Sequence, residues 1–259
     1  MIEIQHISKK FGDRVIIDDI SAQFKPGMCN LIIGTSGSGK TVLVKCIVDL
    51  LKADKGEIIF DQVPFSKMGK EDRKELRQNL GMLFQGNALF DSMTVEENVR
   101  FPLDMFSELS IEEKKIKVNE ILTRVRLEGV NNKFPAELSG GMKKRVGLAR
   151  ALVMQPKYLF CDEPNSGLDP QTSMVIDKLI HELTVEFNIT TIVVTHDMNS
   201  VMEIGNYIIY LNQGKKEWEG SNQDIIFSQN KLLNNFIFAS EFLQDAKSMR
   251  MMEQKNQPQ

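Results

Sequence analysis

Short apolar runs alternate with longer amphipathic stretches along this chain of 259 residues. The runs Met28–Ile33, Tyr158–Cys161 and Thr191–Thr195 are rich in β-branched or aromatic residues and are almost continuously apolar. Strands that are covered on both faces of a sheet have this pattern. A loop and a longer helical stretch follow each run, and this order predicts a parallel sheet in an α/β fold.

Other segments alternate between apolar and polar residues, as strands with one solvated face do. Ile2 and Ile4 alternate with polar neighbours, and residues 57–61 show the same pattern. Asn212-Gln213-Gly214 has the composition of a hairpin turn. We expect these segments to form a second, smaller antiparallel sheet.

Residues 86–152 predict a mainly helical insert in the α/β core. Ser110 precedes Glu113 by three positions, which is the spacing of a capping box at the start of a helix. The helix that follows has an apolar face made of Val118, Ile121, Leu122 and Val125. A further helical stretch extends from 138 to 152.

The chain becomes helical and more polar from Ser221 onward. Helical spacing predicts an apolar stripe made of Leu232, Phe236, Ala239 and Leu243. A stripe exposed on a terminal helix is expected to pack on the core, on a second copy or on a small partner protein. Residues 249–259 are expected to be loose.

The composition, with 42% apolar and 26% charged residues, is ordinary for a globular protein. A net charge of −3 gives no electrostatic reason to expect nucleic acid as a partner. The cysteines lie in apolar stretches, and their spacing indicates no metal site. No export signal is evident, and no apolar run approaches the ~20 residues that span a bilayer. If the protein acts at a membrane, another subunit must hold it there.

Gly34–Thr41 fits the phosphate-binding pattern G-x-x-x-x-G-K-[ST] between a predicted strand and a predicted helix. Glycines let backbone amides turn toward phosphate oxygens, and the start of the helix adds a positive dipole end. We expect Lys40 to contact the β- and γ-phosphates and the Thr41 hydroxyl to bind Mg²⁺. The residues assigned to the nucleotide are Gly34, Thr35, Ser36, Gly37, Ser38, Gly39, Lys40 and Thr41.

The apolar run Tyr158–Cys161 ends in two carboxylates, Asp162 and Glu163. A carboxylate at a strand end beside a phosphate loop can hold the Mg²⁺ shell, and we assign this role to Asp162. Glu163 is placed to polarise an attacking water. Without the glycine loop, the pair would be equally compatible with a surface position. Together the two segments predict binding of ATP and Mg²⁺.

Leu138–Val146, with the sequence LSGGMKKRV, is the most specific feature of the chain. It resembles the LSGGQ-type signature of ATP-binding-cassette (ABC) proteins, with Met142 where glutamine is commoner. Ser139, Gly140 and Gly141 open a predicted helix, which makes a second anion site from exposed amides. The resemblance implies that this signature closes on the γ-phosphate held by a second copy, so that a homodimer hydrolyses ATP.

Four further residues match positions of the same family. Gln85 resembles the Q-loop glutamine, which reaches Mg²⁺ and water, and Asp169 resembles the D-loop aspartate, which links two active sites. His196 resembles the switch histidine that contacts the γ-phosphate. Phe11 lies where ABC proteins stack an aromatic ring on adenine, although a buried core phenylalanine is the alternative. The resemblance thus implies that Glu163, His196 and Gln85 are catalytic and that Thr41, Gln85 and Asp162 bind Mg²⁺.

The resemblance covers about residues 1–225 and implies a P-loop NTPase fold. We expect a RecA-like parallel-sheet core, an antiparallel β subdomain and an inserted helical subdomain at about 86–152. Residues 226–259 then form a C-terminal helical extension and a loose tail.

Two classes of ABC protein compete, namely the detached ATPase of a membrane transporter and a soluble protein that acts on DNA or ribosomes. The absence of sustained heptads between phosphate loop and signature, and the single cassette, favour the transporter and require a separate permease. Residues 85–103 and the Met142–Val146 sequence resemble ATPases of Mce-associated phospholipid transporters (Mla type), although Asn165 stands where threonine is commoner. This implies an Mce-domain subunit and a position on the cytoplasmic face of the bacterial inner membrane. The alternative is an importer of amino acids or other small solutes.

Overall fold

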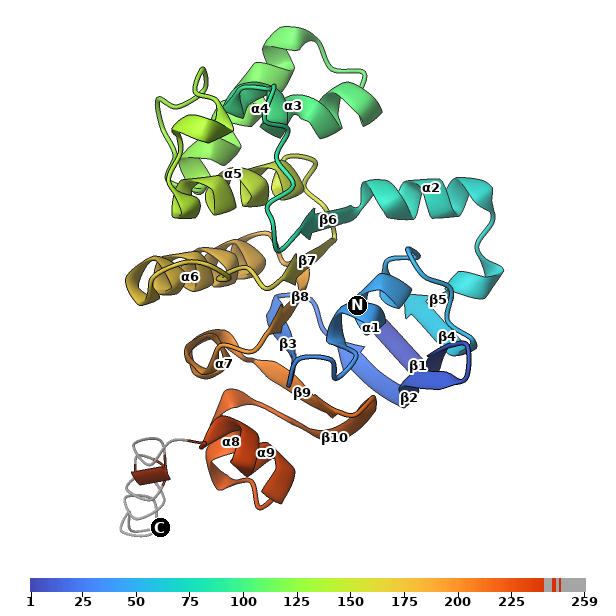
Figure 1. Ribbon diagram of the computed structural model, residues 1–259. Coiled ribbons are helices and arrows are strands. Elements are labelled where there is room, and N and C mark those ends of the chain that lie inside the picture. Colours follow the sequence, from blue (N-terminus) through green and yellow to red (C-terminus); the bar gives the residue numbers. More distant parts are fainter. Residues whose placement is uncertain (240–243, 246, 248–259) are drawn as a thin grey trace, which may run out of the picture.

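The strands of the chain form two sheets in the computed structural model, which describes residues 1–239, 244, 245 and 247 (Figure 1). The strands are β1 (Ile2–Phe11), β2 (Arg14–Phe24), β3 (Met28–Gly34), β4 (Lys55–Phe60), β5 (Val63–Pro64), β6 (Leu80–Leu83), β7 (Tyr158–Asp162), β8 (Thr190–Thr195), β9 (Tyr207–Asn212) and β10 (Lys215–Gly220).

The larger sheet has the strand order β10-β9-β3-β8-β7-β6. All neighbours from β9 to β6 are parallel, and β10 is antiparallel to β9 at one edge. The central strands β3 and β8 are almost wholly buried, which explains their nearly continuous apolar sequences. The predicted parallel core is therefore confirmed.

The smaller sheet has the order β2-β1-β4-β5 and is antiparallel throughout. Ile2 and Ile4 are buried while Gln5 is exposed, as their alternation predicted. The predicted turn at 212–214 does form a hairpin, but its strands β9 and β10 belong to the larger sheet. The expectation that this hairpin belongs to the smaller sheet is wrong. Alternation identifies a strand with one solvent-exposed face, but it does not identify the strand with which it pairs, which for β9 is β3.

Helices cover the larger sheet and also form a separate group. The helices are α1 (Lys40–Ile47), α2 (Lys70–Gln78), α3 (Val95–Phe106), α4 (Ile111–Arg124), α5 (Gly140–Leu152), α6 (Pro170–Glu186), α7 (Met198–Ile204), α8 (Asn222–Phe227) and α9 (Lys231–Ile237), with 3₁₀ turns η1 (Phe65–Lys67) and η2 (Pro135–Glu137). Figure 1 shows α3, α4 and α5 together beyond β6. This group lies between β6 and β7 in the sequence and forms the predicted helical insert.

The predicted capping box at the start of α4 is present. The Ser110 hydroxyl accepts a hydrogen bond from the Glu113 amide, and the Glu113 carboxylate accepts one from the Ser110 amide. The predicted apolar face is buried in the core, and it consists of Val118, Ile121, Leu122 and Val125. These local signals agree, and the helix forms where the sequence predicts it.

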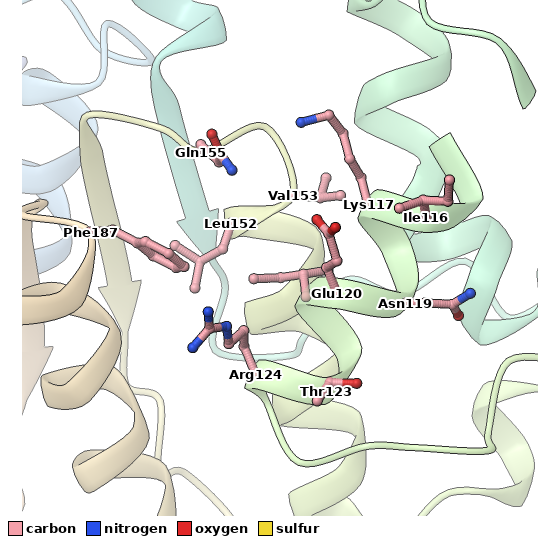
Figure 2. Close-up of a pocket in the computed structure, with 11 residues that line it drawn as sticks. Ile116, Lys117, Asn119, Glu120, Thr123, Arg124, Leu152, Val153, Gln155 and Phe187 are labelled. Carbon is pink, nitrogen blue, oxygen red and sulfur yellow. The ribbon is translucent and has the colours of Figure 1, made fainter. Parts of the chain in front are cut away.

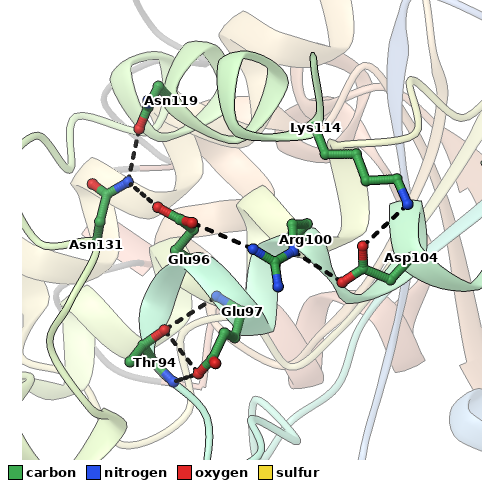
Figure 3. Close-up of polar contacts among 8 residues, drawn as sticks. All are labelled: Thr94, Glu96, Glu97, Arg100, Asp104, Lys114, Asn119 and Asn131. Carbon is green, nitrogen blue, oxygen red and sulfur yellow. Dashed lines mark hydrogen bonds and ion pairs between the residues drawn. The ribbon is translucent and has the colours of Figure 1, made fainter. Parts of the chain in front are cut away.

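Charged side chains join α3 to α4 (Figure 3). The Arg100 guanidinium lies 3.4 Å from the Glu96 carboxylate and 2.9 Å from the Asp104 carboxylate. Lys114 of α4 lies 3.2 Å from the same Asp104 carboxylate. Asn131, from the loop before α5, donates to Glu96 at 3.2 Å. The contacts connect three segments of the helical group along one face.

The predicted C-terminal stripe is wrong, because α9 ends at Ile237 and cannot carry a stripe as far as 243. Its buried residues are Leu233 and Ile237, whereas Leu232 is 45% exposed. Phe236 stacks on Tyr210 of β9, with ring centroids 5.2 Å apart. Ala239 is exposed beyond the helix and does not continue the stripe. Leu243, and residues 249–259 that were expected to be loose, lie outside the described residues. None of the described helices is both long and apolar enough to cross a membrane.

Candidate nucleotide site

The phosphate loop Gly34–Thr41 connects the end of β3 to the start of α1. Gly34, Gly37 and Gly39 have φ angles of +151°, +79° and +102°, which residues with a side chain rarely adopt. A Cβ atom at Gly34 would also collide with the carbonyl oxygen of Leu211. The conformation of the loop therefore depends on glycine.

Lys40 is the first residue of α1 and is 8% exposed. Its Nζ donates to the carbonyl oxygens of Gly34 at 2.8 Å and Thr35 at 3.0 Å. Burial lowers the pKa of Lys40, and the carboxylates of Glu163 and Asp162 oppose this shift. The ammonium group is thus held within the loop and faces the carboxylates at the end of β7.

Asp162, the last residue of β7, lies beside the phosphate loop. The Thr41 hydroxyl lies beside its carboxylate and acts to lower the pKa of Asp162. Burial and the neighbouring Glu163 raise the pKa of Asp162, while Lys45 and Lys40 lower it. The Oδ1 atom is buried without a hydrogen-bond partner among the described residues. A buried carboxylate oxygen beside a threonine hydroxyl fits a Mg²⁺ ion that takes its other ligands from phosphate and water.

Glu163 follows directly and meets His196 from the neighbouring strand end. The His196 Nδ1 atom lies 2.9 Å from Oε1 and 2.8 Å from Oε2 of Glu163. Glu163 has a φ angle of +48°, and its amide donates to the Val194 carbonyl at 2.9 Å. The Glu163 side chain is 15% exposed and that of His196 is 66% exposed. The pair therefore presents a carboxylate and an imidazole at the carboxyl ends of two neighbouring strands.

Gln85 lies just beyond β6 and is exposed. Its Nε2 donates to the Ser166 hydroxyl at 3.4 Å. In the described part of the chain, no hydrogen bond joins Gln85 to Asp162 or Thr41. The glutamine is thus turned toward the loop after β7, which leads into α6.

Asp169 and Phe11 occupy the margins of the site. Asp169 caps α6, because its carboxylate accepts from the Thr172 amide at 3.0 Å and from the Thr172 hydroxyl at 2.5 Å. These bonds lower the pKa of Asp169. Phe11 ends β1 and is 50% exposed, with Lys9 Nζ 5.5 Å from its ring centroid. Phe11 is therefore not a core residue, and its ring is available to a stacking partner.

The signature residues open α5, where Ser139 is the N-cap and accepts from the Met142 amide at 3.3 Å. Both glycines lie against the start of α6. A Cβ atom at Gly141 would lie 2.5 Å from the Thr172 methyl group, and one at Gly140 would lie 3.3 Å from Leu168. The glycines thus permit close contact between two helix starts.

The two predicted phosphate-binding elements stay apart within one chain. In residues 1–239, no hydrogen bond or ion pair joins the signature residues 139–141 to the phosphate loop 34–41. Figure 1 shows α5 in the helical group beyond β6, whereas α1 lies by the antiparallel sheet. Within the described part of one chain, the signature and the phosphate loop therefore do not meet.

Sequence reasoning missed a buried polar cluster behind the site. Asn165 Nδ2 lies 2.9 Å from both carboxylate oxygens of Asp177 and 2.9 Å from the Ser200 hydroxyl. The Ser200 hydroxyl donates to Asp177 at 2.8 Å. Burial raises the pKa of Asp177 to about 6. The available signals were asparagine at 165, where threonine is commoner, and an acidic residue next to Ile176 on the buried face of α6.

Two further missed residues lie on α5 and reach the segment after β6. Lys144 is 2% exposed, and its Nζ donates to the Gln85 carbonyl at 2.6 Å. The Arg150 guanidinium donates to the carbonyls of Asn87 at 2.8 Å and Ala88 at 2.7 Å. Lys144 follows Gly141 by three positions and precedes Leu148 by four, so helical spacing puts it on the buried face. That spacing was the signal that could have identified it.

A groove of about 690 Å³ lies elsewhere on the molecule (Figure 2). Side chains of α4, including Lys117, Glu120 and Arg124, line it together with Phe187 and the end of α5. None of its lining residues belongs to the nucleotide motifs. The nucleotide site is therefore located by the phosphate loop, the carboxylates and the histidine, which lie together. The volume of the groove does not locate it.

Comparisons with known proteins agree with this geometry. The sequence profile described as ABC transporter matches residues 17–166. The methionine import ATP-binding protein MetN of Clostridium tetani is 38% identical over 245 residues, which cover 94% of this chain and 76% of that protein. The intermembrane phospholipid transport system ATP-binding protein MlaF of Haemophilus influenzae is 37% identical over 237 residues, covering 92% and 90%.

A solved structure also resembles the chain. It is a dimeric ATP-binding cassette in a post-hydrolysis state bound to ADP and Pi, with a TM-score of 0.76 and 32% identity. The match covers 86% of this chain and 99% of that one. The profile match at 17–166 includes the phosphate loop, the signature and both carboxylates at the end of β7. The chain therefore belongs to the ABC transporter family. It is the ATPase subunit of a transporter, and it binds ATP with Mg²⁺ and hydrolyses the ATP.

Proposed function

We propose that this ATPase drives a transporter that moves phospholipid between membranes. It acts as a homodimer on the cytoplasmic face of the bacterial inner membrane, where a separate permease holds it. The observation that carries the substrate assignment is the resemblance of residues 85–103 and of Met142–Val146 to Mce-associated ATPases, together with the similarity to MlaF. The two stretches contact each other, since Lys144 bonds to the Gln85 carbonyl.

Import of methionine or another small solute is the second candidate. MetN from Clostridium tetani has 38% identity to the chain, against 37% for MlaF from Haemophilus influenzae. Overall similarity thus does not separate the candidates. Purification of the chain with its membrane partners, followed by identification of these partners by mass spectrometry, distinguishes the two candidates. A permease accompanied by an Mce-domain protein supports lipid transport. A solute-binding protein instead supports import of a small solute.

In the proposed mechanism, residues of the phosphate loop bind the triphosphate through backbone amides and Lys40. Thr41 and Asp162 would hold Mg²⁺, and Gln85 would be a further ligand. Bound Mg²⁺ offsets charge that develops on the phosphates. Phe11 stacks on the adenine ring, for which its exposed position is suited.

Glu163 accepts a proton from the attacking water in this mechanism. His196, which already contacts the Glu163 carboxylate, binds the γ-phosphate and orients the glutamate. The water is thereby activated at the position where the phosphate loop presents the γ-phosphate. Each residue directly follows the end of one of two adjacent parallel strands, so the sheet brings the two side chains together.

A second copy completes each site. Ser139, Gly140 and Gly141 at the start of α5 offer backbone amides to the γ-phosphate bound by the partner chain. Asp169, which caps the neighbouring helix α6, links the two sites across the dimer. Mixing a Ser139→Arg chain with a Lys40→Ala chain tests this arrangement, because one intact composite site can form only between the two variants. Recovery of ATP hydrolysis supports it, and no recovery at any mixing ratio contradicts it.

An Mce-domain subunit and a small protein bound to the C-terminal extension complete the proposed complex. Because α9 packs on the core through Leu233 and Ile237, truncation before it would uncover buried residues. Truncation after Ala239 instead keeps α9 and removes residues 240–259, including the contacts of Lys247 with Ser228 and Asn234. Loss of a co-purifying small protein, with the ATPase activity retained, supports binding by the tail. Unchanged composition of the complex contradicts it.

A further inference from the structure

Among the described residues near the site, Lys144 is the most completely buried cationic side chain, at 2% exposure against 8% for Lys40. It lies in the second turn of α5, three residues after Gly141, and is 2% exposed. Its ammonium group is 2.6 Å from the Gln85 carbonyl oxygen and 3.5 Å from the Glu163 carbonyl oxygen. One cation therefore connects the signature helix to the backbone of two residues whose side chains act in hydrolysis.

The segment that contains Gln85 needs support from outside. Asn87 and Ala88 have φ angles of +63° and +48°, a conformation that costs non-glycine residues free energy. Arg150, six positions after Lys144 on α5, donates to both of their carbonyls. The segment from Gln85 to Ala88 is thus held from one helix at two points, and Lys144 holds the end that carries the glutamine.

The backbone of Glu163 is constrained in the same way. It also has a positive φ angle, of +48°, and its amide donates to Val194. Its carbonyl accepts from the Ser166 amide at 3.1 Å and from the Lys144 ammonium at 3.5 Å. The carboxylate of Glu163 projects toward His196. A shift of the carbonyl would therefore turn the carboxylate away from the histidine.

A buried ammonium group strongly favours such contacts. Removing a charge from water is costly unless it is hydrogen-bonded, so Lys144 disfavours any arrangement in which the two carbonyls move away from it. The carboxylates of Asp162 and Glu163 add a favourable electrostatic interaction. Movement of α5 relative to the sheet would consequently carry Gln85 with it and disturb the backbone of Glu163.

We propose that Lys144 is a positioning residue for ATP hydrolysis, which fixes the Gln85 segment to the backbone of Glu163. It has this role only if Gln85 and Glu163 act as proposed above. Its effect is expected on the catalytic step, because neither contact involves the phosphate loop. The lysine stem also fills space between α5 and the sheet, and the experiment must separate this packing from positioning.

The test compares kcat, KM, ATP affinity and Tm of the full chain and its Lys144→Met, Lys144→Arg and Lys115→Met variants. Methionine preserves most of the stem volume and removes the donors. Lys115→Met is the control, because Lys115 is an exposed lysine of the same helical group. A displacement of about 1 Å costs a catalytic site roughly 100-fold, so we expect a loss of kcat of about 10- to 100-fold in Lys144→Met. The KM and ATP affinity should change little, and Lys144→Arg should recover part of the loss.

Wild-type kcat in Lys144→Met overturns the proposal. Equal loss of kcat in the methionine and arginine variants, together with lowered Tm and ATP affinity, also overturns it and assigns Lys144 to packing alone. Should Lys144→Met fail to fold, Lys144→Gln, which removes the charge and shortens the stem, is compared with Lys144→Arg. A lower kcat in Lys144→Gln at equal Tm then supports the proposal, and equal kcat in the two variants overturns it. Glu163→Gln is measured in parallel. If Glu163→Gln retains turnover, the role proposed for Glu163 fails, whereas loss in Glu163→Gln with none in Lys144→Met removes only the present proposal.

Discussion

His196 Nδ1 lies 2.8 Å from Glu163 Oε2, across the ends of two adjacent parallel strands. The sheet brings the two residues together, because each follows the end of its strand and the Glu163 amide bonds to Val194 of β8. An imidazole and a carboxylate at neighbouring strand ends can orient each other. They can also orient a water molecule that attacks the γ-phosphate.

Replacing His196 with alanine should therefore lower kcat with little effect on ATP affinity. Loss of an acid–base or orienting group costs about 100-fold or more in rate. Steady-state hydrolysis and equilibrium binding of ATP measure the two quantities. His181→Ala on α6 is the matched control, and equal activity of the two variants would rule out a role for His196.

Lys40→Ala should weaken the binding of ATP. Hydrogen bonds from a charged group contribute about 1.5 to 3 kcal/mol, so affinity should fall roughly 10- to 100-fold. Calorimetric titration with ATP and Mg²⁺ measures this, with the exposed Lys52 changed to alanine as the control. Unchanged affinity in Lys40→Ala would show that the phosphate loop has been assigned incorrectly.

The buried Asp177 carboxyl predicts a pH dependence of stability. Burial raises its pKa from 3.8 to about 6, and the nearby Asp197 and Glu203 act in the same direction. Between these values the folded state binds more protons at this site than the unfolded state, so the free energy of unfolding falls as pH rises. From about pH 4.5 to about pH 7.5 the contribution amounts to about 2 kcal/mol.

Urea unfolding of the wild type and Asp177→Asn at these two pH values tests the prediction. The stability of the wild type relative to the variant should decrease by about 2 kcal/mol as pH rises. Asp91→Asn, at an exposed position, should show no such change relative to the wild type. A constant difference for Asp177→Asn would contradict the assignment of the shifted pKa to this group.

The sequence predicted those parts of the fold that local signals determine. The continuous apolar run of β3 and the capping box of α4 each specify their own element, and both formed as expected. The hairpin after Asn212 also formed, but alternation could not show that β9 pairs with β3, since pairing is decided by tertiary contacts. The terminal stripe failed because nothing local in the pattern marked the end of α9 at Ile237.

The candidate site divides in the same way. The glycines of the phosphate loop and the pair at Asp162 and Glu163 were visible because their chemistry requires particular residues at fixed spacing. Lys144 and Asn165 act through partners far away in the sequence, namely Gln85 and Asp177. Helical spacing indicates the buried face of α5 for Lys144, but these partners became evident only when the strands and α5 were assembled.

The turn that follows Gln85 depends on a buried asparagine. Asn98 accepts from the Phe90 amide at 2.8 Å and donates to the carbonyls of Phe90, Met93 and Thr94 at 3.0 Å each. Asn98→Ala leaves these groups without their partner and should lower the free energy of unfolding by about 3 kcal/mol. Urea denaturation measures the loss. Asn119→Ala, an exposed asparagine in the same helical group, should change stability far less, and equal losses would contradict the account.

The central claim is that two copies share two ATP molecules and that Glu163 is needed for turnover, but not for this assembly. Light scattering of Glu163→Gln with ATP and Mg²⁺ tests both parts, with hydrolysis followed in the same sample. We predict a species of twice the mass of one chain that retains ATP, and a turnover about 10²- to 10⁴-fold below that of the wild type. A monomer at saturating ATP, or hydrolysis at the wild-type rate, would contradict the claim.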